Sequence, residues 1–335
     1  MNSTPHAPSS EGELLHGVLV GCSVPDSVAN TLSALRLIED VVLLPDAEPI
    51  WQREDAGERY RSTQALYKAP DGYVLSIACE GSGRFKITAA SIVVDWDGGT
   101  PYTHYLQTLA LALWLELRGI PCIHANALAI DEDRAIGLMA PSRGGKSTLS
   151  AALIKHGAQL CTDDMVALYP ASPRGFGVYP AKPVMRLWPD SAQTFVSSSD
   201  AQVLPRVHSR FAKRELTLTD DSAVCRSRRD LVALFVLDRT EPSDPAADKN
   251  TDSDASPALT TAISPSVEPI AGAAALLQLM QNSMLADAYA ALDIQLSRAV
   301  ELSRLVDQVP IYRLNYASDM QQLPKVCAQI LSAVS

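Results

Sequence analysis

The segment from Ala140 to Ser147 (APSRGGKS) has the residue types of a loop that binds phosphate groups. Such loops use glycines so that successive backbone N–H groups turn towards the phosphates, and the helix that follows directs its positive end at them. A lysine then reaches the terminal phosphates, and a hydroxyl residue holds Mg²⁺. The consensus is GxxxxGK[ST], and here Ala140 replaces the first glycine while the remainder fits. The residues predicted to contact phosphate or its metal are Ser142, Arg143, Gly144, Gly145, Lys146, Ser147 and Thr148.

Two adjacent carboxylates, Asp163 and Asp164, lie in the otherwise apolar stretch QLCTDDMVALY. Carboxylates in such surroundings are costly unless they bind a cation or a proton. Phosphoryl transfer needs one carboxylate near Mg²⁺ and often a second that accepts the proton of the attacking hydroxyl. We predict that Ser147 and Asp163 bind Mg²⁺ and prefer Asp164 as the base, although the sequence does not distinguish the two aspartates. Neighbouring residues of a strand face opposite sides, so the strand must bend or end here if both serve one site.

His124 and Lys146 complete the predicted catalytic group with the two aspartates. His124 belongs to the stretch CIHANALAI (122–130), which precedes the strand that leads into the loop. Neighbouring strands lie about 4.8 Å apart, so its side chain is within reach of the phosphate site. The alternative for His124 is a buried histidine with a purely structural hydrogen bond. For the two aspartates it is a solvated pair at the end of a strand.

The elements around the loop are those needed to position it. The polar turn 131–134 separates two β-type runs, 122–130 and 135–140, which predicts a hairpin whose second strand feeds the loop. The apolar spacing over 147–156, followed by Gly157, predicts a helix directly after it. A strand, a phosphate loop and a helix in this order support nucleotide binding more strongly than the short string GKS.

The whole chain is predicted to be α/β, with an N-terminal β-rich region at 13–100 and an ATP-binding domain at 101–335. Residues 1–12 are rich in Ser and Pro and are predicted to be a disordered tail. Residues 241–267 are dominated by small and polar residues and are predicted to be a disordered insertion that is dispensable for the chemistry. The apolar stretch 105–117 is too short to span a bilayer and predicts a buried helix.

Composition excludes several classes of partner. The chain has 335 residues, 47% of them hydrophobic, and a formal net charge of −10. An acidic chain is a poor non-specific binder of nucleic acid and of anionic membrane surfaces. The six cysteines contain no CxxC pair, which favours reduced thiols in a cytoplasmic protein.

These motifs, in this order, resemble the HPr kinase/phosphorylase family. The resemblance is carried by IHANALAI followed by LMAPSRGGKSTLSAALIKHGAQLCTDD, over roughly residues 120–170. It implies a fold shared with phosphoenolpyruvate carboxykinase, a Mg²⁺- and ATP-dependent serine kinase activity, and assembly into homo-oligomers. By position, Lys146 and Ser147 match the loop lysine and the Mg²⁺ ligand, Asp163 and Asp164 match the paired aspartates, and His124 matches the strand histidine.

The sequence departs from the family in its loop and further downstream. Ala140 and Arg143 replace family glycines, and PVMRLWPDSA stands where the family has a second Gly-rich stretch. These departures argue against HPr as the acceptor, and the layout is closer to diverged members that phosphorylate a serine of a lasso-peptide precursor. Candidate cations for the developing phosphoryl charge are Arg186, Lys213 and Arg214.

The function predicted from sequence is therefore a kinase that uses ATP and Mg²⁺ to phosphorylate a serine hydroxyl on a protein or peptide, such as a ribosomal peptide precursor. Two alternatives stay open at this point. One is a small-molecule kinase of the carboxykinase-like fold, and the other is a nucleotide-binding regulatory module without catalysis. Aspartates turned away from the loop would favour the regulatory module.

Overall fold

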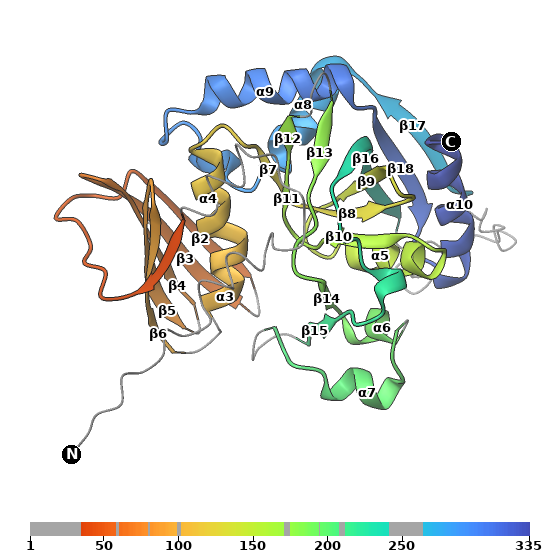
Figure 1. Ribbon diagram of the computed structural model, residues 1–335, viewed down its shortest axis with the longest axis horizontal. Helices are drawn as coiled ribbons and strands as arrows, with labels where there is room; N and C mark the ends of the chain where they lie inside the picture. Colours follow the sequence, from red (N-terminus) through yellow and green to blue (C-terminus); the bar gives the residue numbers. More distant parts are fainter. Residues whose placement is uncertain are drawn as a thin grey trace, which may run out of the picture.

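The computed structural model describes residues 35–57, 60–79, 81–98, 102–170, 175–193, 195–207, 212–240 and 264–335. Its β-strands form a separate N-terminal sheet and a larger mixed sheet, with helices between and around them (Figure 1). The mixed α/β architecture with an N-terminal β-sheet region agrees with the sequence-based prediction. The predicted tail at 1–12 lies outside the described residues, as do the residues 241–263.

The N-terminal sheet has the strand order β1-β6-β5-β4-β3-β2. Its strands pair antiparallel except β1 with β6, which are parallel. The turn at Pro70-Asp71 connects β3 to β4, because proline and aspartate favour turns. The strands are β1 (Arg36–Glu39), β2 (Trp51–Gly57), β3 (Tyr60–Ala69), β4 (Gly72–Ala78), β5 (Ser82–Thr88) and β6 (Ser91–Asp97).

The larger sheet is built around β9 and β16, which run parallel, with β8 and β10 beyond β9 and with β13 and β18 beyond β16. Two short two-stranded ladders, β7 with β11 and β14 with β15, flank it. The strands are β7 (Cys122–Ile123), β8 (Ala125–Ala129), β9 (Arg134–Met139), β10 (Gln159–Thr162), β11 (Val166–Ala167), β12 (Tyr169–Pro170), β13 (Phe176–Val178), β14 (Val184–Leu187), β15 (Arg214–Thr217), β16 (Arg229–Thr240), β17 (Ser266–Ile270) and β18 (Ile311–Ala317).

Helices cover both faces of the larger sheet. Leu128, Ile136 and Leu138 pack with α5 and α10 on one face, while the small side chains of Ala125 and Ala127 face α8 and α9 on the other. The helices are α3 (Tyr102–Tyr105), α4 (Leu111–Glu116), α5 (Lys146–Lys155), α6 (Pro189–Ala192), α7 (Ser198–Val203), α8 (Gly272–Gln281), α9 (Gln295–Gln308) and α10 (Leu323–Ala333). Short 3₁₀ turns are η2 (Asp221–Ala223), η3 (Ala286–Ala288) and η4 (Met320–Gln322), and η1 (Leu106–Ala110) is a π-helical segment.

The carboxyl ends of four strands meet at one edge of the larger sheet. The β8–β9 hairpin is antiparallel, β10 is antiparallel to β8, and both β9 and β18 are parallel to β16. Strands β10, β9, β16 and β18 therefore all point the same way. Ligands of open α/β sheets bind outside such carboxyl ends. This edge carries the predicted phosphate-binding loop after β9 and the aspartate pair after β10.

The predicted buried helix is present as α3, η1 and α4, and it lies between the N-terminal sheet and the rest of the chain (Figure 1). Leu106, Leu109 and Leu113 share one core with Leu75 and Phe85 of the sheet. The same core contains Leu285, Tyr289 and Leu292 from the C-terminal part. Among the described residues, no helix combines the length and the apolar character needed to cross a membrane.

Two expectations about elements need correction. The stretch QLCTDDMVALY is not one strand, because β10 ends at Thr162 and β11 begins at Val166 in a different ladder. The Thr162 hydroxyl donates to the Met165 carbonyl across this turn. The predicted disordered insertion at 241–267 also extends too far, since Ser266 and Val267 begin β17 and pair with β18.

A buried ion pair connects α4 to α9 and provides a test of stability. Arg298 Nε lies 2.6 Å from Glu116 Oε2, and both side chains are essentially inaccessible to solvent. We expect Arg298→Ala to lower the free energy of unfolding by about 3–5 kcal/mol, because it leaves a carboxylate buried without its cation. Urea unfolding followed by circular dichroism measures this.

The matched control is Arg304→Ala on the same helix, whose pair with Glu301 is exposed. Exposed pairs contribute at most about 1 kcal/mol, so this variant should unfold close to the unchanged protein. Equal unfolding midpoints for the two variants would show that the buried pair does not stabilise the fold.

Candidate functional site

The predicted phosphate-binding loop lies between β9 and α5, so the expected order of strand, loop and helix is present. Gly145 immediately precedes α5 with φ 92°, a left-handed conformation that glycine adopts without strain. A Cβ on Gly144 would come 2.6 Å from the Ala140 Cβ, so that position also requires glycine. Ala140 is not among the described residues with positive φ. The alanine that replaces the first consensus glycine therefore fits the loop without backbone strain.

Lys146 turns back into the loop. Its Nζ lies 2.6 Å from the carbonyl oxygen of Ala140 and 3.2 Å from His124 Nε2, and its side chain is buried. Burial lowers the pKa of Lys146 to about 8, although the negative charge of Asp164 acts to raise it. A bound phosphate would restore the charge that burial disfavours. The lysine is thus positioned at the centre of the loop, where a phosphate would lie.

His124 lies between β7 and β8, where its backbone N–H donates to the Asn282 carbonyl at 2.6 Å. Burial, reinforced by the nearby Lys146 cation, lowers the pKa of His124 to about 4. The imidazole is therefore neutral near pH 7 and accepts a hydrogen bond from Lys146 through Nε2, which assigns the proton to Nδ1. Its 4.0 Å approach to Asp164 is a contact with a neutral ring rather than an ion pair.

The aspartate pair occupies the turn after β10. Asp164 adopts a left-handed backbone with φ 67°, which aspartate tolerates better than most residues. Its backbone N–H donates to Asn126 Oδ1 at 3.1 Å, and Asn126 Nδ2 donates to Ser150 Oγ of α5 at 3.0 Å. This connection through Asn126 holds the turn against the helix that follows the phosphate loop.

The Asp164 carboxylate faces the loop and is surrounded by basic side chains. Oδ2 lies 3.4 Å from Arg186 Nη1 and 3.8 Å from Lys213 Nζ. Burial alone would raise the pKa of Asp164, but Lys213 and Arg186 outweigh it and hold the pKa below its ordinary value. Asp164 therefore stays ionised at neutral pH, on the loop side of the turn.

Asp163 has the opposite electrostatic character. Its Oδ2 accepts a 2.8 Å hydrogen bond from the Arg186 backbone N–H, while Oδ1 is buried with no hydrogen-bond partner among the described residues. Burial, and next the charge of Asp164, raise the pKa of Asp163 to about 7. The two aspartates are thus distinguished by their surroundings, which the sequence could not reveal.

The remaining loop residues have separate positions. Arg143 has a left-handed backbone, φ 68°, and its guanidinium carbon lies 5.5 Å from the Trp188 ring centroid. Thr148 Oγ1 lies 2.6 Å from Ser191 Oγ of α6. Ser142 is exposed, and Ser147 is half-buried in the first turn of α5. Arg143 and Thr148 therefore connect the loop and the start of α5 to the stretch MRLWPDSA (185–192).

Of the three candidate cations, the structure brings two to the aspartates. Arg186 and Lys213 reach Asp164, whereas Arg214 Nη1 donates to the Leu204 carbonyl at 3.0 Å and forms no ion pair with either aspartate. Neighbouring residues of an extended chain point to opposite sides, so Lys213 and Arg214 cannot both face the site. The structure therefore does not bring Arg214 to the aspartates.

Sequence reasoning missed residues that long-range packing supplies. Gln107 accepts a 3.0 Å hydrogen bond from Arg186 Nη2 and belongs to the π-helical segment η1, a feature frequent at functional sites. Arg239 and Tyr316 lie beside Gly145 from the ends of β16 and β18. Asn126 could have been identified from the sequence, because it is a polar residue two positions after His124 in an apolar strand. Nothing local in the sequence pointed to the other three.

The donor set fits a triphosphate that carries its own metal ion. The described residues contain no group of three or more His, Cys, Asp or Glu side chains that could hold a metal ion. Mg²⁺ needs only one or two carboxylates when phosphate oxygens supply further ligands. The unpartnered Asp163 Oδ1 is an acceptor of that kind.

No sequence model of a known protein family matches the chain. No curated protein matches it in sequence. Among solved structures, it is similar to the HPr(Ser) kinase/phosphatase from Coxiella burnetii, with 14% sequence identity and a TM-score of 0.31. The similarity covers 63% of this chain and 95% of that chain, and at these values no residue role can be transferred.

Proposed function

We propose that the protein is a kinase that transfers the γ-phosphoryl group of ATP, with Mg²⁺, to a serine hydroxyl of a protein or peptide. One observation carries this proposal. Lys146 of the phosphate loop contacts His124, and His124 contacts Asp164, so a phosphate-binding group and an ionised carboxylate lie in one cluster. A regulatory module without catalysis would not need a carboxylate turned towards the loop.

In the proposed reaction the loop backbone and Lys146 bind the β- and γ-phosphates. The serine oxygen attacks the γ-phosphorus, the bond from that phosphorus to the β–γ bridging oxygen breaks, and ADP leaves. The hydroxyl proton passes to the Asp164 carboxylate. Arg186 and Lys213 stabilise the negative charge that spreads over the transferred group.

Asp163 and Ser147 are the proposed metal ligands from this chain. Mg²⁺, when bound, would neutralise charge on the β- and γ-phosphate oxygens. A cation beside Asp163 would also lower the pKa of that carboxyl from about 7, because it would favour the ionised form. The metal-binding role of Asp163 and the proton-accepting role of Asp164 are therefore mutually consistent.

Asp164 is preferred as the proton acceptor on geometric grounds. A base must reach the hydroxyl before its pKa matters. Asp164 lies on the loop side of the turn, whereas Asp163 is held by the Arg186 backbone. A low pKa does not exclude this role, because the transition state of phosphoryl transfer is loose and little proton transfer is required early.

The test is incubation of the protein with γ-labelled ATP, Mg²⁺ and serine-containing peptides, including those encoded beside its gene. We expect label on a peptide serine, identified by mass spectrometry, and none when that serine is replaced by alanine. Label on a small molecule instead would favour the small-molecule kinase. ATP binding with no transfer to any acceptor would favour the regulatory module.

A further inference from the structure

The guanidinium of Arg186 is held by two side chains that come from different parts of the chain. Its Nη1 lies 3.4 Å from Asp164 Oδ2, and its Nη2 donates a 3.0 Å hydrogen bond to Gln107 Oε1. Its Nε is buried and, within the described part of the chain, has no hydrogen-bond partner. The orientation of the guanidinium is therefore set by one carboxylate and one amide, and the amide makes the shorter contact.

An amide suits this position because it is neutral. Gln107 Oε1 accepts the hydrogen bond without bringing a negative charge to the guanidinium. The positive charge of Arg186 is thus left for Asp164 and for the phosphoryl group of the proposed reaction. Since only 6% of Arg186 is exposed, water has little access to replace the amide.

Gln107 reaches Arg186 from the π-helical segment η1. The backbone N–H of Leu111 donates to the Leu106 carbonyl, which is the i→i+5 spacing of a π-helix. The other residues of η1 are buried, whereas Gln107 is half-buried. Leu106 and Leu109 belong to the core that is shared with the N-terminal sheet. The segment therefore keeps its leucines in that core while its glutamine contacts the arginine beside the aspartate pair.

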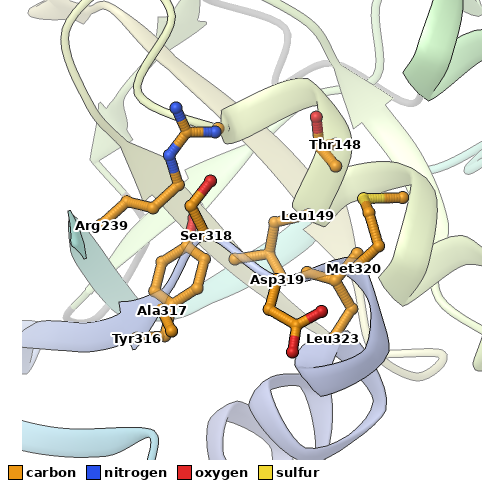
Figure 2. A pocket seen from close by; sticks show the side chains of 10 residues that line it. Thr148, Leu149, Arg239, Tyr316, Ala317, Ser318, Asp319, Met320 and Leu323 are labelled. Atoms are coloured by element: carbon orange, nitrogen blue, oxygen red, sulfur yellow. The ribbon is translucent and has the colours of Figure 1, made fainter. Parts of the chain in front are cut away.

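Another arginine beside the loop is positioned in a different way. Arg239 lines a small pocket next to Gly145, together with Tyr316 (Figure 2). Both side chains come from the larger sheet, near the ends of β16 and β18. Arg186 differs, because Gln107 connects it to the helix that packs against the N-terminal sheet. The orientation of Arg186 thus depends on both parts of the chain.

We propose that Gln107 is a positioning residue for phosphoryl transfer, which orients the Arg186 guanidinium towards Asp164 and the transferred group. This rests on the proposed function, and it adds a residue that acts on the reaction through Arg186. Without the amide, the Arg186 backbone stays in place because its N–H is bonded to Asp163, but the guanidinium loses its shorter side-chain contact. The consequence is slower transfer with unchanged nucleotide affinity.

Gln107→Leu tests the proposal, because leucine accepts no hydrogen bond. With γ-labelled MgATP and the serine-containing peptides encoded beside the gene, kcat should fall about tenfold, while the calorimetric affinity for MgATP stays within about twofold. Gln107→Asn keeps an amide but withdraws it by one methylene, so it should slow transfer too and replaces the leucine variant if that one unfolds. Gln329→Leu is the matched control, since Gln329 is exposed on α10, and it should change neither value.

A double-mutant cycle shows whether Gln107 acts through Arg186. Arg186→Lys keeps the charge but lacks the planar fork that contacts both Asp164 and Gln107, so it should itself slow transfer. Adding Gln107→Leu should then change the rate by less than about twofold, because residues in contact are not additive. A full effect of Gln107→Leu in the Arg186→Lys background, or no effect of either Gln107 variant alone, would overturn the positioning role and leave the kinase proposal intact. If the unchanged protein labels no acceptor, the proposed function itself fails, and the role of Gln107 fails with it.

Discussion

Replacement of Lys146 by alanine should reduce MgATP affinity and phosphoryl transfer by at least about 10²-fold, the typical effect of losing one preorganised donor to developing charge. Lys146 Nζ is held inside the loop by the Ala140 carbonyl and His124. The fold should persist, because the variant removes a buried cation whose pKa burial already lowers to about 8. Calorimetry with MgATP and a labelled-ATP transfer assay measure the two effects.

Lys155→Ala is the natural control for this prediction. Lys155 lies in the last turn of the same helix, α5, and is exposed to solvent. It has the same charge and the same helix context but lies at the opposite end from the loop. Unchanged MgATP affinity and turnover in Lys146→Ala would mean that the loop does not bind phosphate.

Asp164→Asn should lower the rate of phosphoryl transfer by about 10²–10⁴-fold while MgATP still binds, since the amide cannot accept the serine proton. Asparagine suits this test because it tolerates the left-handed backbone that Asp164 adopts at φ 67°. Removing a negative charge near the phosphates should, if anything, strengthen nucleotide binding. Single-turnover kinetics with labelled ATP separates the transfer step from binding.

Asp163→Asn is the paired variant. It should raise the Mg²⁺ concentration needed for half-maximal activity, because Asp163 is the proposed metal ligand. Its effect on transfer at saturating Mg²⁺ should be smaller than that of Asp164→Asn. Wild-type transfer rates in both variants would exclude the mechanism, and a reversed pattern would exchange the two roles.

Local patterns in the sequence were sufficient to predict the elements on either side of the loop. The hairpin before the loop, the loop itself and helix α5 are consecutive in the chain, so turn residues and periodicity determine them directly. The aspartate pair follows one short strand later, and its approach to the loop results from β10 running parallel to β9. The predicted order of hairpin, loop and helix is present in the structure, whereas the roles of the loop and of the aspartates stay predictions.

The parts that the sequence did not reveal depend on contacts between residues distant in sequence or on backbone detail. Arg239 and Tyr316 reach the loop only because β16 and β18 pair in one particular register. Gln107 reaches Arg186 from a helix that belongs equally to the N-terminal core. Whether Lys213 or Arg214 faces the aspartates depends on the orientation of a short extended segment. No periodic pattern in the sequence there indicates this orientation.

The helix from Tyr102 to Glu116 also determines how the protein can be divided. A boundary at residue 101 assigns it to the ATP-binding half, yet its leucines lie in one continuous core with the N-terminal sheet and with Tyr289. Separating the halves there would expose that core on both fragments. The two halves should therefore melt as a single cooperative unit, with equal calorimetric and van't Hoff enthalpies. In evolutionary terms, the N-terminal sheet could not be gained or lost as an independent module without rebuilding this helix.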